Sequence, residues 1–422
     1  MKTLKKILCI LIIVAIIILI VLICFSKSYK NNKDNIKYNE NVNITNSNTS
    51  HNPILENEDT YDVSLLNKIE LVNNRNKYFA ISNIIDTYTN NNFIINKMYI
   101  TKKATNIDVF WVEGIKKDTN TLSNLIISTD SLNKVFAVIN EEQIEQNAYS
   151  LNNLNSIDTN KITYNSDNKF EYKNINDEEY VQYLLKDYLI KTLYNTQLGY
   201  NLLKEEYREK KFGSFEKYNE IININRDKLA LYDTKNIKQA GEFSSYEEWL
   251  LYFGRVQLLE VEKYLIKSND NYTEYTIVDT YGNYYIFVED TVMNYKLMLD
   301  TYTIDTLEFL EKYEEVSKEG KGEMNIDKIF EAINNKDYNY VYNKLDANYK
   351  NRYFTTLESF STFMSNNLFE KNEVEFDEYE ESENSCKYSL IIKDASGQNK
   401  NQILMTMIMQ LGENTDFTIK FE

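Results

Sequence analysis

The chain has 422 residues, with 47 Lys and Arg against 64 Asp and Glu, one His, three Cys and one Pro. This length predicts two or three domains, and a hydrophobic content of 43% is enough to give each a core. A formal charge of −17 argues against a nucleic-acid-binding protein, which needs a basic surface to displace counterions. One His and three Cys leave little material for a zinc site or a histidine-based catalytic triad.

The N-terminal residues predict a membrane anchor. Residues 7–25 form an uninterrupted apolar run, which as a helix would span roughly 28 Å, close to the roughly 30 Å hydrocarbon core of a bilayer. A cleaved signal peptide is the alternative, but no cleavage site of small residues follows the run. We therefore expect a cytoplasmic tail at 1–6, a transmembrane helix in the lipid bilayer at 7–25, and a body outside the cytoplasm.

Residues 26–60 are dominated by Asn, Ser, Thr and charged residues and contain the His and the Pro, His51 and Pro53. They show no apolar period, so we predict a disordered stalk. Beyond the stalk, Cys386 is the single cysteine and alternates with Tyr388, Leu390 and Ile392. This pattern predicts a small buried side chain, with no intramolecular disulfide in the body.

The first folded stretch, residues 61–142, is predicted to be an abbreviated α+β unit. Its helix is marked by an apolar spacing of three and four residues, at Tyr78, Ile81, Ile85 and Tyr88. Three strands are expected after it, at Ile107–Ile115, Leu122–Thr129 and Lys134–Ile139. Residues 143–176 are mostly polar and are predicted to be a linker.

An internal repeat follows. Residues 200–218 match residues 342–360 without a gap, at a constant offset of 142. The identical positions include Tyr200/Tyr342, Asn201/Asn343, Leu203/Leu345, Tyr207/Tyr349, Phe212/Phe354 and Glu216/Glu358. The apolar spacing from Tyr338 to Tyr349 predicts one continuous helix, the first arm of a helical hairpin. Ser214 and Thr356 are predicted to cap the second arm.

Each copy belongs to a larger predicted unit, at 177–305 and 321–422. An amphipathic helix precedes each hairpin, and about four antiparallel strands follow it, so helices would pack against a curved sheet. In the middle unit a turn at Asp279–Asn283 separates two strands, and a strand at Tyr295–Thr303 follows. A connecting helix is predicted at 306–320, and an insertion at about 227–256.

Three helices followed by an antiparallel sheet, with the pattern F-x-[ST]-[FL]-E-x-[FY] at the third helix, resemble the cone-shaped nuclear transport factor two-like fold. The layout is similar to uncharacterised single-pass surface proteins of low-G+C Gram-positive bacteria that carry such domains in tandem. Tyr200–Ser214 and Gly282–Phe287 carry this likeness. The resemblance implies an α+β fold with an N-terminal transmembrane helix, but no established activity, and this fold hosts isomerases, dehydratases and binding modules alike.

No catalytic, cofactor-binding or metal-binding residue is predicted. The acidic run Glu373–Glu383 could bind divalent cations, but a solvated sheet edge that resists aggregation explains it better. Met405–Met409 could line a ligand cavity, but a strand of the core explains it better. No Asp lies alone in an apolar strand, as a raised pKa would require, and no phosphate loop or nucleophile elbow is present.

We therefore expect a membrane-anchored extracytoplasmic interaction or scaffold module of the bacterial envelope, without catalysis or cofactor. Its partner would be an envelope protein that the sequence does not identify, and its oligomeric state is open. One alternative is a scaffold of a conjugation or secretion channel. Another is small-ligand binding, or an isomerase-type activity, in a cone cavity.

Overall fold

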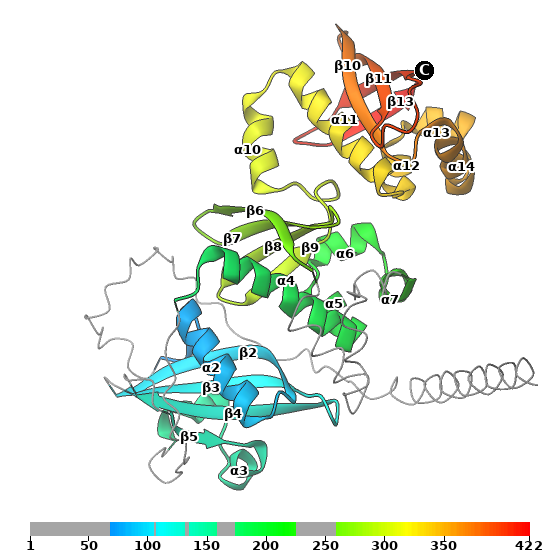
Figure 1. The fold of residues 1–422 in the computed structure, drawn as a ribbon. Coiled ribbons are helices and arrows are strands. Elements are labelled where there is room, and N and C mark those ends of the chain that lie inside the picture. The colour runs from blue at the N-terminus through cyan, green and yellow to red at the C-terminus, as the bar shows by residue number, and fades with distance from the viewer. Residues whose placement is uncertain (1–67, 105–106, 131–134, 158–173, 225–258) are drawn as a thin grey trace, which may run out of the picture. The chain divides into compact units, whose positions relative to one another are not determined.

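The computed structural model describes residues 68–104, 107–130, 135–157, 174–224 and 259–422, which all belong to one unit of the chain, residues 52–422. Three antiparallel sheets organise these residues, and each has its strands in sequence order. Helices accompany every sheet, as Figure 1 shows. The structure is therefore α+β.

The first sheet has five strands. Their bounds are β1 Glu70–Leu71, β2 Phe93–Ala104, β3 Ile107–Lys116, β4 Thr121–Asp130 and β5 Val135–Ile139. Helix α2 (Arg75–Tyr88) lies over one face of this sheet (Figure 1), and its first turn is capped by the Asn74 side chain. The predicted helix and three predicted strands are confirmed. Strand β2 was missed, because its apolar residues alternate irregularly with Asn and Lys.

The other face of the first sheet is covered by residues that were predicted to be linker. Helix α3 (Glu141–Gln146) and the 3₁₀ helix η2 (Leu151–Ser156) follow β5 and bury Ile144 and Leu154 against the sheet. Strand β3 accordingly points Phe110 to the α2 side and Trp111 to the α3 side, and both are buried. A strand covered on both faces explains the continuous apolar run in this stretch of sequence.

In its described residues, the second unit has four helices followed by a four-stranded sheet. Its helices are α4 Asp177–Tyr194, α5 Thr196–Leu202, α6 Glu205–Lys211 and α7 Phe215–Ile224. Its strands are β6 Val261–Ser268, β7 Thr273–Asp279, β8 Tyr284–Thr291 and β9 Asn294–Met298. The turn at Asp279–Asn283 is confirmed, whereas the strand predicted to reach Thr303 ends at Met298. The predicted insertion at 227–256 lies outside the described residues.

The third unit repeats this order. Its helices are α10 Leu307–Glu315, α11 Lys318–Asn334, α12 Tyr338–Lys344, α13 Ala347–Tyr353 and α14 Leu357–Asn367. Its strands are β10 Asn372–Glu381, β11 Cys386–Asp394, β12 Ile403–Leu411 and β13 Phe417–Phe421. The connecting helix predicted for 306–320 ends at Glu315. The Ser317 hydroxyl caps a new helix, α11, by accepting a hydrogen bond from the amide of Gly320.

The first arm of the predicted hairpin is two short helices in both repeats. Leu203 interrupts the arm in the second unit and Leu345 in the third, each in an extended conformation. Leu203 forms a parallel bridge with Leu297 of β9, and Leu345 forms one with Ile419 of β13. The amides that follow, of Lys204 and Asp346, donate to strand carbonyls at 3.0 and 2.8 Å. The helical hydrogen bonding is therefore interrupted at this leucine, and the backbone there pairs with the last strand of the sheet.

The repeated tyrosines Tyr200 and Tyr342 have closely similar surroundings. The ring of Tyr200 lies 5.4 Å from that of Tyr218, and the Arg208 guanidinium lies over it at 5.2 Å. At the same offset, the ring of Tyr342 lies 5.7 Å from that of Phe360, and the Lys350 ammonium lies over it at 3.8 Å. The predicted caps Ser214 and Thr356 accept from the amides of residues 217 and 359.

In the part of the chain that the structure describes, the buried apolar side chains form three clusters. One joins the α2 face of the first sheet to the helices and sheet of the second unit, including Ile85, Tyr180 and Phe287. A second lies under α3 and η2. The third belongs to the last unit and contains Cys386, Met407 and Met409. The core interpretation of Cys386 is confirmed, and so is that of the methionine strand at Met407 and Met409.

The predicted fold class needs one correction, which concerns the membrane anchor. Among the described residues, no helix is long and apolar enough to cross a membrane. The longest of these helices, α4, carries Asp, Glu and Lys side chains along its length. What the structure gives is α+β without a membrane span in its described part. The predicted transmembrane helix at 7–25 and the stalk at 26–60 lie outside the described residues.

Candidate functional site: the cleft between α2 and α4

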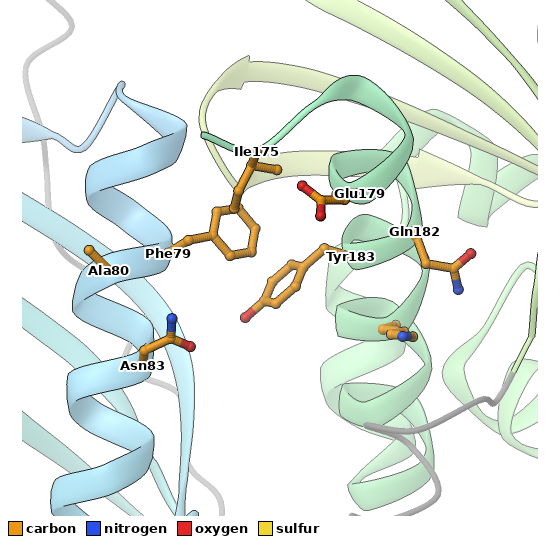
Figure 2. A pocket seen from close by; sticks show the side chains of 8 residues that line it. Phe79, Ala80, Asn83, Ile175, Glu179, Gln182 and Tyr183 are labelled. Carbon is orange, nitrogen blue, oxygen red and sulfur yellow. The ribbon is translucent and has the colours of Figure 1, made fainter. Parts of the chain in front are cut away.

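A cleft of about 300 Å³ lies between α2 of the first unit and α4 of the second. Figure 2 shows the rings of Phe79, from α2, and Tyr183, from α4, in the space between the two helices. The two rings meet edge to face, with centroids 4.3 Å apart. The cleft is lined by Phe79, Ala80, Asn83, Ile175, Glu179, Gln182, Tyr183 and Lys186. Its walls therefore combine aromatic and aliphatic surface with amide and charged groups.

Local capping fixes where each helix begins. The Asn74 side chain accepts from the amide of Lys77 at the start of α2. At the start of α4, the side chains of Asn176 and Glu179 form a reciprocal capping box. Three glutamate and aspartate residues in the first turn of α4 suit the positive end of its dipole. Glu179 thus serves the helix cap and also lines the cleft.

Polar contacts join the first turn of α2 to the start of α4 and to the segment that precedes it. The Asn76 side chain donates to Asn174 at 3.0 Å and accepts from the amide of Ile175 at 3.0 Å. Arg75 donates to Asp177 at 2.7 Å. These bonds join segments about a hundred residues apart in the chain and hold α2 beside α4.

A buried carboxylate, Glu289 of β8, lies at the centre of a polar cluster that also holds α2, α4 and β7 together. The Tyr180 hydroxyl and the Met293 amide donate to its Oε1, and the Tyr275 hydroxyl donates to its Oε2 at 3.0 Å. The Arg75 guanidinium lies 3.8 Å above the Tyr180 ring and donates to the Tyr275 hydroxyl. Burial raises the pKa of the Glu289 carboxyl to about 6.

Glu289 is poorly placed for chemistry on a bound molecule. Both of its oxygens accept hydrogen bonds from protein groups, and its side chain is 6% exposed. It is not among the residues that line the α2–α4 cleft. A general base needs a proton of the substrate within hydrogen-bonding reach. The cluster therefore acts as internal support for the wall of the cleft.

Among the described residues of the cleft wall, Lys186 is the one with a cationic side chain. It lies half-buried one turn beyond Gln182 on α4. Burial lowers the pKa of its ammonium, and the nearby charge of Glu260 acts in the opposite direction. A partly desolvated ammonium gains more from a bound carboxylate or carbonyl than a fully hydrated one does.

A second cavity, of about 460 Å³, adjoins the first. It is lined by Glu178, Glu179, Gln182, Val261, Glu262, Lys263 and Tyr264. Glu179 and Gln182 line both cavities, so the two lie on either side of the same stretch of α4. The Gln182 amide donates to the Leu259 carbonyl at 2.6 Å and accepts from the Val261 amide at 3.1 Å.

The sequence predicted none of these residues as a site. The acidic run that it singled out is strand β10, at one edge of the third sheet, with Glu373, Glu375 and Glu380 exposed. Among the described residues, no group of three or more His, Cys, Asp or Glu side chains is arranged to hold a metal ion. The signal for Glu289 was present, because it continues the buried alternation of Tyr285 and Phe287.

No family model matches this chain, and the searches of curated proteins and of solved structures found no match either.

Proposed function

We propose that this protein is a non-enzymatic protein-interaction module and that the α2–α4 cleft is a docking site for a partner. The observation that carries the proposal is the cleft itself, which lies between two units and has aromatic walls. The polar groups of the Glu289 cluster beside it are hydrogen-bonded to one another. Such a cleft suits a large apolar side chain of a partner, because burying an anchor of this kind dominates interface energetics. Residues around the anchor would then contribute shape and charge.

One further feature favours binding over catalysis. The tyrosines inside the second unit are used for packing and for bonds to carboxylates, as Tyr207 with Asp300 at 2.7 Å and Tyr295 with Asp187 at 2.6 Å. A hydroxyl already committed to a carboxylate is not free to stabilise an oxyanion. The location outside the cytoplasm and the likeness to nuclear transport factor two-like surface proteins stay predictions.

The test is site-specific photo-crosslinking in cells that make the full-length protein. A benzophenone amino acid replaces Asn83, an exposed residue in the cleft wall. The matched control places it at Thr87, which is exposed one turn further along α2 and outside the cleft lining. We expect one discrete protein adduct from position 83 and none from position 87. Equal adducts from both positions, or none from either, would contradict the proposal.

A further inference from the structure

The two edges of the second sheet differ. Strand β9 lies at one edge, where Leu203 bridges to Leu297 and the Lys204 amide donates to the Leu297 carbonyl. Strand β6 lies at the other. There the Gln182 side chain bonds the Leu259 carbonyl and the Val261 amide, one at each end of a short backbone segment. A side-chain amide thus takes the place that a neighbouring strand would occupy at the start of β6.

The second cavity is lined by Gln182 and by the first residues of β6. Its strand wall is Val261–Tyr264, and Glu262 and Tyr264 there are exposed, Tyr264 by 42%. An edge strand presents backbone groups that can pair with an added strand. A segment that lies along β6 would therefore have a backbone partner on one side and a hollow for its side chains on the other.

The charges around the two cavities are unequal. Among the described residues that line the second cavity, three are glutamates, Glu178, Glu179 and Glu262, and one is a cation, Lys263. The first cavity offers the aromatic rings of Phe79 and Tyr183. A basic group is favoured in the second cavity, because it would meet an excess of carboxylates, and an apolar group is favoured in the first.

We propose that these adjoining cavities bind an extended segment of a partner protein, with a Lys or Arg side chain among the three glutamates and a large apolar side chain in the α2–α4 cleft. This rests on the proposed function and names the chemistry of the partner. Backbone pairing with β6 supplies affinity that does not depend on sequence. The basic and apolar side chains supply the specificity. Strand pairing with the bound segment would stop at Val261, because the Gln182 side chain already accepts a hydrogen bond from the Val261 amide.

The test uses the full-length chain and a random dodecapeptide library displayed on phage. We expect the selected pool to be enriched in Lys or Arg close to an aromatic or large aliphatic residue. Selection on a chain carrying Glu178→Lys and Glu262→Lys should instead enrich Asp or Glu. A peptide from the first pool, labelled with fluorescein, should bind this double variant at least tenfold more weakly by fluorescence anisotropy.

The matched control carries Glu373→Lys and Glu378→Lys, two exposed glutamates of the edge strand β10. It has the same change of net charge, so its selected pool should stay basic and its affinity for the labelled peptide should stay within twofold. Circular dichroism and the melting temperature establish that each variant is folded. A pool without basic enrichment, or an equal loss of affinity in the control, would overturn the inference. If photo-crosslinking at position 83 gives a protein adduct but the selected peptides are not enriched in Lys or Arg, this inference fails and the proposed function stands.

Discussion

Glu289 lies outside the lining of the candidate site, in the polar cluster beside it. Its carboxyl is buried, which disfavours ionisation, and three donors partly offset that effect. The balance leaves its pKa at about 6, above the ordinary value of 4.5. The folded protein therefore binds a proton at Glu289 more tightly than the unfolded chain does.

This residue should make stability depend on pH. Between about pH 4.5 and 6 the unfolded chain loses the proton while the folded protein keeps it, so the Glu289 contribution falls as pH rises and is constant above pH 6. A shift of this size is worth about 2 kcal/mol. In Glu289→Gln we expect this component to vanish, as measured by urea unfolding at several pH values. Parallel pH curves for variant and wild type would refute it.

Gly322 is required for a different reason, the close approach of Tyr388. A Cβ atom at position 322 of α11 would lie 1.8 Å from the Tyr388 hydroxyl oxygen, which donates to the Glu319 carbonyl. The helix accepts a glycine in its interior, at a propensity cost of about 1 kcal/mol, because the phenol occupies the space.

Gly322→Ala should therefore destabilise the protein by about 1–3 kcal/mol, despite the better helix propensity of alanine. The control is Gly320→Ala in the same helix, where the nearest atom is Val316 Cβ at 3.0 Å. We expect the control to be close to neutral, since a shift of a few tenths of an ångström by Val316, which precedes α11, relieves the contact. Urea unfolding measures the stability of the two variants. Equal stability of both would show that the close approach of Tyr388 is not the reason why position 322 needs a glycine.

At this scale the sequence could have predicted more than it did. The alternation of Tyr285, Phe287 and Glu289 places a carboxylate on a buried face, although this carboxylate is a Glu near the end of its strand and not an isolated Asp within it. The cleft residues could not be found in this way. Phe79 and Tyr183 look like ordinary core positions of two amphipathic helices, and nothing local in the sequence says that these helices meet.

Among the elements, the interrupted helices show where periodicity misleads. From Tyr338 to Tyr349 the apolar spacing fits one helix, yet Leu345 is extended and pairs with β13. A hydrogen bond to a distant strand outweighs the local preference, and the spacing of side chains carries no information about that strand. The predicted cap at Thr356 is correct because capping is a local interaction: the Thr356 hydroxyl accepts from an amide only three residues further along the chain.

Helix α6 ends in two lysines with different roles. Lys210 pairs with Glu206 on the exposed face, at 2.8 Å. Lys211 donates to the Tyr302 hydroxyl at 2.6 Å, lies 3.1 Å from buried Asp300, and pairs with Asp337, the cap of α12. Lys211 thus links the second unit to the first turn of α12 in the third.

Removing Lys211 should be costly, because Asp300 and Asp337 would lose their shared cation while Asp300 stays buried. We expect Lys211→Ala to lower the free energy of unfolding by about 3 kcal/mol. In Lys210→Ala the loss should be under about 1 kcal/mol, as for other exposed pairs. Denaturant titration of both variants makes the comparison, and similar losses would show that the Lys211 cluster contributes no more than a surface pair.

For the molecule as a whole, the division of the core is the main feature. The first and second units share one apolar cluster, whereas the last unit has its own. Shared burial couples stability, since neither part can expose its face without exposing that of the other. The sequence suggested three separate units because helix and strand patterns report local order and not which faces are shared.

We therefore expect two unfolding transitions in calorimetry, one for the first two units together and one for the last. Leu184→Ala, at a buried position of α4, should lower the first, and Ile329→Ala, at a buried position of α11, should lower the second. Each change should cost about 2–5 kcal/mol. A single transition lowered by both variants would mean that the whole body unfolds as one.

The bridges of Leu203 and Leu345 have a consequence for self-association. Each bridge pairs part of the last strand of its sheet, β9 or β13, with the chain's own backbone. Copies of the protein that pair through the strands of these two sheets should therefore meet more readily at β6 or β10 than at β9 or β13.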